Sequence, residues 1–268
     1  MKGRVLIVAG SDSGGGAGIQ ADIKTVTALG GFAMTAITAL TAQNTLGVHD
    51  VLPVDTGFIQ TQMRVVLEDL GADCLKTGML HSSEVIETVC TVAEAEAAGI
   101  PLVVDPVMVA KGGAALLGIE AVAAMRDRLL PLARVITPNI PEAETLLGME
   151  IGTLDAMKRA AELLLEMGAA AVLIKGGHMT GKVLTDVLLD DGGFHLFESE
   201  RVDTPHTHGT GCTMASAIAT GLAQDLPLPL AVGRAQAYVA AAIRAAPGYG
   251  QGHGPIDHGH TVSPFGTG

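Results

Sequence analysis

The chain has 268 residues, 48% of them hydrophobic and 3% aromatic, and a formal net charge of −12. This length suits one large α/β domain, and no Pro/Ser-rich linker, charge block or fixed repeat divides it, so we expect a single domain over 1–268. The acidic balance disfavours nucleic acid or an anionic membrane as a partner, because both require a basic protein face.

Short apolar runs alternate with longer segments of helical periodicity along the whole chain. In chain order we predict a strand at 5–9, a helix at 17–29, a strand at 33–40, a helix at 56–70, a strand at 73–77, a helix capped by Ser82 and running to residue 98, a strand at 102–105, a helix at 119–130, a strand at 135–137, a helix at 141–147, a helix at 153–167 capped by Thr153, a strand at 171–175, a hairpin of 183–189 with 194–198, and helices at 212–224 and 230–245.

The alternation of strands and helices predicts a mostly parallel central sheet with helices on both faces. In such sheets ligands bind beyond the carboxyl ends of the strands. Polar and Gly-rich segments follow several of the predicted strands, so they should meet at one edge, which we expect to be the active site. These segments lie after the first strand, after Leu40, and at Lys76, Asp105, Asn139 and Lys175.

The segment Gly209-Thr210-Gly211-Cys212 directly precedes a helical run of small residues. Glycines let the backbone curl so that several N–H groups point at one spot, and the helix dipole adds positive potential there. The pattern indicates a receptor for negative charge, such as a phosphoryl group in transfer. Cys212 would lie at the helix N-terminus, where a thiolate is stabilised. The alternative is a Gly-rich turn with a buried cysteine.

A second glycine-rich loop, between Gly14 and Gly18, follows the first predicted strand. Its spacing fits a dinucleotide fingerprint, which also requires an acidic residue about 20 positions later. No Asp or Glu occurs between Ile23 and His49, and the chain has no G-x-x-x-x-G-K-[ST] segment. The sequence therefore disfavours a Rossmann oxidoreductase and a P-loop kinase. The loop is either a plain turn or part of a ligand pocket.

Three charged residues lie at the predicted sheet edge. Asp105 ends a buried apolar strand, and Glu142 follows Asn139 in an N-x-x-E pattern at the start of a predicted helix. Lys175 ends a strand before glycines and can lie along phosphates. Each has a structural alternative: a turn aspartate before Pro106, a first-turn helix acid, and a surface lysine.

Seven segments carry a family resemblance: 8–22, 39–45, 76–80, 104–108, 137–144, 175–178 and 209–212. In this order they closely resemble the hydroxymethylpyrimidine/phosphomethylpyrimidine kinases of thiamin biosynthesis, which belong to the ribokinase-like superfamily. The resemblance runs from about Val5 to His258. It implies a three-layer α/β sandwich and an ATP- and Mg²⁺-dependent kinase. The implied substrates are 4-amino-5-hydroxymethyl-2-methylpyrimidine and then its monophosphate.

The resemblance also implies which residues bind the pyrimidine. Gln43 has donors and an acceptor that can match the ring nitrogen and the exocyclic amine, although a surface loop glutamine is the alternative. By resemblance Asp22 and the backbone near Gly10 and Met79 help to hold the ring.

At the phosphate end, the resemblance implies that the backbone N–H groups from Gly209 to Cys212 hold the transferring phosphoryl group. Mg²⁺ would be placed by Asp105 and Glu142. Cys212 would either accept the proton of the substrate hydroxyl or only orient that hydroxyl, and superfamily relatives often have Asp there. The implied catalytic residues are Cys212, Gly211, Gly209 and Lys175, and those implied for ATP are Lys175, Asn139 and Thr210.

The chain departs from the family pattern at two positions. Gln236 replaces a lysine that is common in the last helix, which leaves the efficiency of the second phosphorylation open. Asp257 replaces an asparagine before His258 in a Gly-rich tail. We expect the tail histidines not to bind a metal, because no Cys or carboxylate cluster accompanies them.

The remaining expectations concern class, assembly and location. A pyridoxal or pyridoxamine kinase of the same superfamily is the alternative enzyme, and a pyrimidine-binding regulator on a kinase fold is the alternative from another class. Cys212, Lys175, Asp105 and Glu142 are all present, which argues against the regulator. The resemblance suggests a homodimer. Three cysteines without C-x-x-C spacing favour the reducing cytoplasm.

Overall fold

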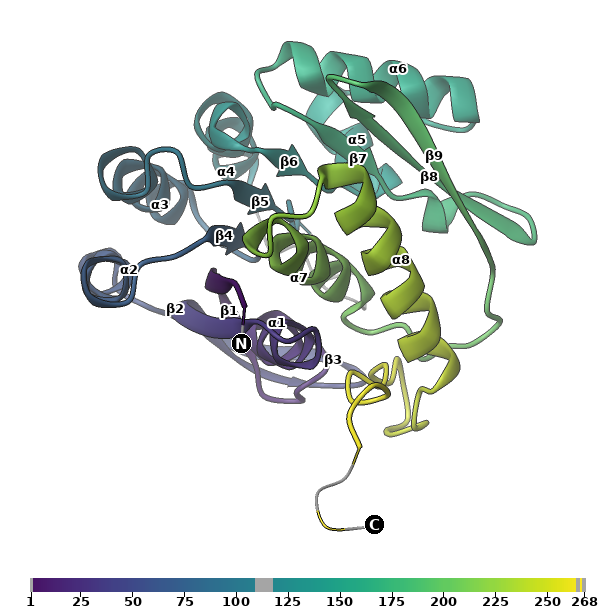
Figure 1. The fold of residues 1–268 in the computed structure, drawn as a ribbon, viewed down its shortest axis with the longest axis horizontal. Coiled ribbons are helices and arrows are strands. Elements are labelled where there is room, and N and C mark those ends of the chain that lie inside the picture. Colours follow the sequence, from purple (N-terminus) through teal and green to yellow (C-terminus); the bar gives the residue numbers. More distant parts are fainter. Residues whose placement is uncertain (1, 109–117, 264–265, 267–268) are drawn as a thin grey trace.

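The structure, a computed structural model, describes residues 2–108, 118–263 and 266. Within these residues lies one nine-stranded sheet with the order β3-β2-β1-β4-β5-β6-β7-β8-β9 (Figure 1). Its strands are β1 (Arg4–Asp12), β2 (Phe32–Asn44), β3 (Gly47–Pro53), β4 (Cys74–Thr77), β5 (Leu102–Val104), β6 (Val135–Ile136), β7 (Val172–Ile174), β8 (Val183–Asp190) and β9 (Gly193–Glu200). The strands from β2 to β7 in this order pair in parallel, and β3, β8 and β9 are antiparallel at the two edges.

Helices cover both faces of the sheet. They are α1 (Gly18–Ala28), α2 (Thr56–Asp69), α3 (Ser83–Glu96), α4 (Ile119–Ala124), α5 (Ile140–Leu147), α6 (Leu154–Glu166), α7 (Thr210–Ala223) and α8 (Leu228–Arg244). One buried core joins the sheet to α1, α7 and α8, and the other joins it to α2 through α6. Figure 1 shows these two helical layers on opposite sides of the strands.

The central strand β1 shows why three layers form. Successive side chains of a strand point to opposite faces, and every residue from Val5 to Ala9 is buried. Leu6 and Val8 enter the core under α2 to α6, whereas Val5, Ile7 and Ala9 enter the core under α1, α7 and α8. A strand that is apolar on both faces requires a covering layer on each side. The predicted fold class, a mostly parallel α/β sandwich, is confirmed.

The predicted N-caps are also confirmed. The side chains of Ser82 and Thr153 accept hydrogen bonds from Val85 N–H and Ala156 N–H, so each satisfies a backbone donor at a helix start.

Two predicted segments differ from the structure. The strand predicted at 33–40 extends to Asn44 and pairs with β3, which the sequence analysis did not predict. The helix predicted at 119–130 is α-helical only to Ala124 and continues as a π-helical turn (Met125–Leu129) and a 3₁₀ turn (Leu130–Leu132). Pro131 lies in that last turn, where its missing N–H prevents a regular α-helix from continuing.

No helix in the described part of the chain is both long enough and apolar enough to cross a membrane.

Candidate active site

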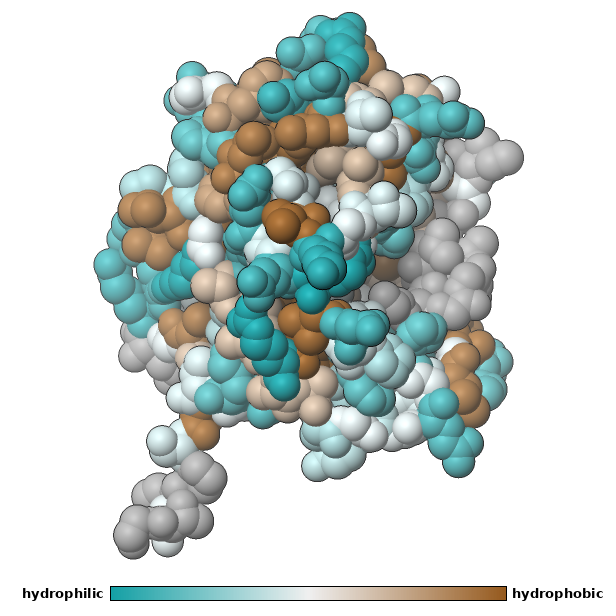
Figure 2. All heavy atoms as spheres, turned by 90° about the vertical axis from the view of Figure 1, so that its right-hand side faces the viewer, coloured by the Kyte–Doolittle hydropathy of each residue, from teal (hydrophilic) through white to brown (hydrophobic). Residues whose placement is uncertain are grey.

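A cavity of about 880 Å³ lies at the carboxyl ends of the parallel strands. Figure 2 shows the side of the molecule toward which these strands point, where hydrophilic residues alternate with smaller hydrophobic patches. The cavity brings together all but one of the site residues predicted from the sequence: Gly10, Gln43, Met79, Asp105, Asn139, Glu142, Lys175, Gly209, Thr210, Gly211 and Cys212. Asp22 is the exception.

The N-terminus of α7 opens into this cavity. Gly209 precedes the helix with φ 84°, in the left-handed region that glycine adopts without strain. A Cβ at this position would also overlap the carbonyl oxygen of Gly16. A Cβ on Gly211 would lie 3.3 Å from Lys175 Nζ and 3.7 Å from Asp105 Oδ2, so the helix start lies beside both charged groups. Glycine is therefore required where the backbone turns into α7, next to these two charged groups.

Hydrogen bonds of Thr213 and His258 hold the backbone turn at Gly209 in place. The hydroxyl of Thr213 donates to Gly209 O at 2.8 Å and lies 2.9 Å from His258 Nε2. Because the single hydroxyl hydrogen goes to Gly209, the ring N–H of His258 donates to Thr213. Burial lowers the pKa of His258 to about 4, so the ring is neutral at pH 7. His258 thus has a structural contact in the tail, and no group of three or more metal-ligating side chains occurs among the described residues.

Lys175 and Asp105 form an ion pair at the cavity wall, with Nζ and Oδ1 3.1 Å apart. Burial opposes the charge of Lys175, but the carboxylates of Asp105 and Glu142 outweigh it and raise the lysine pKa. The ammonium therefore stays protonated beside the start of α7. A cation and a helix N-terminus at one spot stabilise an anion more than either does alone.

Glu142 has two functions in this arrangement. With Asn139 it forms a capping box at the start of α5: Asn139 N donates to Glu142 Oε2 at 2.8 Å, and Glu142 N donates to Asn139 Oδ1 at 2.9 Å. Burial, together with Asp105, raises the pKa of Glu142 to about 7. A positive charge close to this carboxyl group favours its ionised form. The alternative of a first-turn helix acid therefore describes Glu142 correctly, yet the residue also lines the cavity.

Cys212 lies in the first turn of α7, but its environment differs from the one expected. Burial raises the pKa of its thiol to about 12, although Lys76 acts in the opposite direction. The expectation that the helix start lowers this pKa is not met, because loss of solvation outweighs the dipole and the lysine. The thiol is protonated at neutral pH.

Asp22 lies beneath the cavity and does not line it. Its carboxylate is fully buried and accepts hydrogen bonds from Lys76 Nζ, 2.9 Å from each oxygen, and from Ser216 Oγ at 2.7 Å. Lys76 lines the cavity floor from β4 and has no exposed surface. No ion pair of Lys76 with Asp22 was predicted from the sequence. A lysine within the predicted strand 73–77, directly after Cys74 and Leu75, was the available signal of a buried ion pair.

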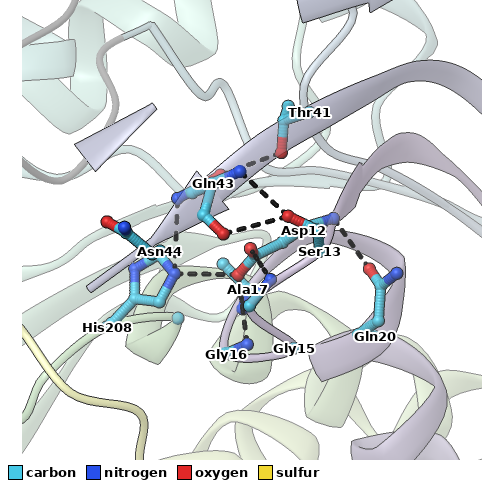
Figure 3. A network of polar contacts seen from close by, with 12 residues as sticks. Asp12, Ser13, Gly15, Gly16, Ala17, Gln20, Thr41, Gln43, Asn44 and His208 are labelled. Atoms are coloured by element: carbon cyan, nitrogen blue, oxygen red, sulfur yellow. Dashed lines mark hydrogen bonds and ion pairs between the residues drawn. The ribbon is translucent and has the colours of Figure 1, made fainter. Parts of the chain in front are cut away.

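A polar network forms another part of the cavity wall (Figure 3). The Asp12 carboxylate accepts backbone N–H bonds from Gly14 at 2.8 Å, Gly16 at 3.1 Å and Ala17 at 2.8 Å, and its Oδ2 lies 2.9 Å from His208 Nε2. Burial disfavours the charge, but these hydrogen bonds prevail and the pKa of Asp12 is lowered. The network holds the glycine loop and the segment before α7 together.

Gln43 completes this network. Its Nε2 lies 3.4 Å from His208 Nε2, and its Oε1 lies 3.2 Å from the hydroxyl oxygen of Thr41. Gln43 was predicted from the sequence to lie in the site, whereas Asp12 and His208 were not. Their only signal was position, since Asp12 opens the first glycine loop and His208 directly precedes the second.

Gln236, the departure from the family pattern, also lines the cavity. Its Nε2 donates to Phe197 O at 3.0 Å and lies 3.5 Å from Asp186 Oδ2. Asp186 in turn accepts the Gly176 N–H at 2.8 Å, directly after Lys175. The amide therefore holds α8 against β8 and β9 beside the lysine.

A parallel sheet between two helical layers, with a glycine-led helix start and a lysine at its carboxyl edge, is the architecture of ribokinase-like phosphotransferases. The family model described as phosphomethylpyrimidine kinase matches residues 12–257, and the chain belongs to that family.

Individual relatives agree with this assignment. The chain is 52% identical to a thiamine biosynthesis bifunctional protein of Geobacter sulfurreducens over 96% of its own length, and it spans about half of that relative, 52%. It is 49% identical to a hydroxymethylpyrimidine/phosphomethylpyrimidine kinase of Bacillus subtilis, with 95% of this chain and 94% of the relative aligned. Among solved structures, an ADP complex of Bacillus subtilis pyridoxal kinase superposes with a TM-score of 0.90 and 39% identity, covering 97% of this chain and 98% of that one.

Proposed function

We propose that the protein transfers a phosphoryl group from ATP to the hydroxymethyl group of 4-amino-5-hydroxymethyl-2-methylpyrimidine, and then a second one to the resulting monophosphate. The observation that carries the proposal is that one cavity contains the Gln43 amide, which can pair with a ring edge, and a helix start beside Lys175, which can receive an anion. A volume of about 880 Å³ is at the upper end of small-molecule sites and suits a nucleotide together with a small ring.

Phosphoryl transfer depends mainly on positioning and charge stabilisation. In our proposal the backbone N–H groups from Gly209 to Cys212 hold the transferring phosphoryl oxygens, with Thr210 and Asn139 at the nucleotide. The Lys175 ammonium neutralises charge on the phosphates. These groups are fixed before any ligand binds, so little reorganisation is required in the transition state.

The neutral thiol of Cys212 defines its proposed part in the reaction. A thiol with a pKa of about 12 already carries its hydrogen at neutral pH and is a poor initial acceptor for the substrate proton. We propose that Cys212 orients the substrate hydroxyl through a hydrogen bond. As the new oxygen–phosphorus bond forms and the bond to the ADP leaving group breaks, the hydroxyl proton passes to an oxygen of the transferred phosphoryl group, which releases it to water.

The site also fits the Mg²⁺ that the family resemblance implies. Two carboxyl groups, Asp105 and Glu142, line the cavity, and burial together with Asp105 raises the pKa of Glu142 to about 7, so a cation bound beside them would favour the ionised form of Glu142. Because no larger ligand cluster lies among the described residues, such an ion would depend on phosphate and water ligands, as Mg²⁺ commonly does. When bound, it would neutralise phosphate charge.

Three further properties belong to this proposal. We propose that the chain functions as one domain, since both cores share one sheet. A homodimer is proposed from the family resemblance. A cytoplasmic location is supported by Cys74, Cys90 and Cys212, all of which are free thiols.

A second candidate substrate is pyridoxal. The observation in its favour is a TM-score of 0.90, at 37% identity, to the pyridoxal kinase of Staphylococcus aureus solved in complex with pyridoxal. Pyridoxal also carries a hydroxymethyl group on a six-membered nitrogen ring.

The test is an ATP-consumption assay of the purified protein against hydroxymethylpyrimidine, its monophosphate and pyridoxal. We expect turnover of both pyrimidines, with kcat/KM for hydroxymethylpyrimidine above that for pyridoxal. Lys175→Met serves as the inactive control. Turnover of pyridoxal alone would replace the proposal with the second candidate, and turnover of none would refute both.

A further inference from the structure

Two polar contacts of the Gln43 side-chain amide cannot be hydrogen bonds as the amide is oriented in the structure. The single hydroxyl hydrogen of Thr41 goes to Ser11 O, at 2.9 Å. The 3.2 Å contact of that hydroxyl with Gln43 Oε1 then joins two acceptors. An amide oxygen has no hydrogen to contribute, so this contact gives no hydrogen bond.

The other contact of the Gln43 amide, with His208, joins two hydrogen-bond donors. Asp12 accepts three backbone N–H bonds, so it is an anion, and the His208 Nε2 that lies 2.9 Å from it must carry a hydrogen. The 3.4 Å contact between His208 Nε2 and Gln43 Nε2 therefore joins two donors. This holds for neutral His208 in its Nε2–H form and for the imidazolium alike.

Both conflicts disappear together when the amide turns by half a rotation. The amide nitrogen then donates to the Thr41 hydroxyl oxygen, and the amide oxygen becomes a second acceptor for the His208 Nε2–H. Figure 3 shows Gln43 between Thr41 and His208, with Asp12 at the same imidazole nitrogen that the Gln43 amide faces. Of the two amide orientations, only this one avoids both the acceptor–acceptor and the donor–donor contact.

From this count of donors and acceptors we propose that His208 is a positioning residue. Held by Asp12, it fixes the orientation of the Gln43 amide and thereby the orientation in which the pyrimidine ring binds. The proposal rests on the proposed function for the assignment of Gln43 to the ring. It adds two residues, His208 and Asp12, to the specificity-determining part of the site.

The orientation matters because the ring edge is not symmetric. Each amide atom makes one bond inside the protein, which leaves one N–H and one oxygen lone pair free for a ligand. An aminopyrimidine offers an acceptor, the ring nitrogen, next to a donor, the exocyclic amine. If the amide were reversed, the ring would have to turn over to keep both bonds, and its hydroxymethyl group would move away from the reactive position.

The kinetic test is a double-mutant cycle between His208→Leu and Gln43→Leu. We expect His208→Leu alone to lower kcat/KM for the pyrimidine about tenfold, the size of one lost hydrogen bond, with KM for ATP unchanged. In the Gln43→Leu background the same change should have no further effect. His208→Gln keeps N–H donors and should restore most of the loss.

The structure offers a matched control. His195 and Asp190 form a second histidine–carboxylate pair, 3.1 Å apart, on the β8–β9 hairpin and away from the cavity lining. His195→Leu should leave kcat/KM for the pyrimidine unchanged. An equal loss from His208→Leu in both Gln43 backgrounds, or a parallel rise in KM for ATP, would overturn the proposal, because His208 would then act without Gln43.

A second measurement needs neither an active variant nor a substrate. Nitrogen NMR of the histidine-labelled wild type reports which ring nitrogen of His208 is protonated, with the signal assigned by its loss in His208→Gln. A hydrogen on Nε2, in the neutral or the charged ring, supports the orientation. An unprotonated Nε2 overturns it. If the enzyme does not turn over the pyrimidine at all, the proposed function fails while this readout still decides the hydrogen-bond network.

Discussion

Replacing Cys212 by serine separates two contributions of the α7 N-terminus, the backbone N–H groups and the side chain. The substitution keeps the backbone, the size and a hydrogen-bonding hydroxyl. Because the Cys212 pKa is about 12, only about one thiol in 10⁵ is ionised at pH 7. If the thiol only orients the substrate hydroxyl, Cys212→Ser should retain kcat within about tenfold.

The pH profile gives the same prediction a second readout. A required thiolate would make kcat rise about tenfold per pH unit from pH 6 to pH 9, since the ionised fraction rises by that factor below the pKa. We predict instead that wild type and Cys212→Ser have superimposable profiles of kcat against pH, measured with saturating ATP and pyrimidine. Cys212→Ala, which also removes the hydrogen bond, is the control and should be slower than the serine variant. A loss of roughly 10²–10⁴-fold in Cys212→Ser, together with a wild-type rise of kcat with pH that this variant lacks, would refute the reasoning and make Cys212 the general base.

Three other predictions concern separate parts of the site. Gln43→Ala should weaken binding of the pyrimidine by about 1–3 kcal/mol, seen as a higher KM for the pyrimidine with an unchanged KM for ATP. An unchanged KM for the pyrimidine would show that Gln43 does not bind the ring. Lys76→Met should lower the free energy of unfolding by about 3–5 kcal/mol in urea titrations, because it leaves the buried Asp22 carboxylate without its partner; a loss below about 1 kcal/mol would show that Asp22 is neutral. The monophosphate should remain a substrate despite Gln236, whose amide contacts Asp186 and Phe197, and accumulation of monophosphate without any diphosphate, followed by chromatography, would contradict this.

The sequence predicted the layers of the fold well because their cause is local. An apolar run such as Val5 to Ala9 requires cover on both faces, and helical periodicity supplies it. The edge strand β3 was missed because His49 and Asp50 interrupt its apolar residues, and its stability comes from pairing with β2. Edge strands are defined by their neighbour more than by their own pattern.

The candidate site likewise contains residues that the sequence could predict and residues that it could not. Gly209 precedes α7, Lys175 follows β7 and Gln43 lies near the carboxyl end of β2, so topology alone places them at the cavity. The pairs Asp12–His208 and Asp22–Lys76 join residues 196 and 54 positions apart, and no local pattern encodes such contacts. The raised pKa of Cys212 could not be predicted from the sequence either, because it depends on the burial of the thiol rather than on its place in the helix.

The central claim is that this cavity phosphorylates one pyrimidine twice. Phosphorus NMR of the purified protein with ATP, Mg²⁺ and hydroxymethylpyrimidine follows both steps in one sample. We predict a phosphomonoester signal that appears first and a diphosphate ester signal that replaces it, while ATP is converted to ADP. A spectrum in which the ATP signals persist, or in which no pyrimidine phosphate forms while ATP is hydrolysed, would contradict the account.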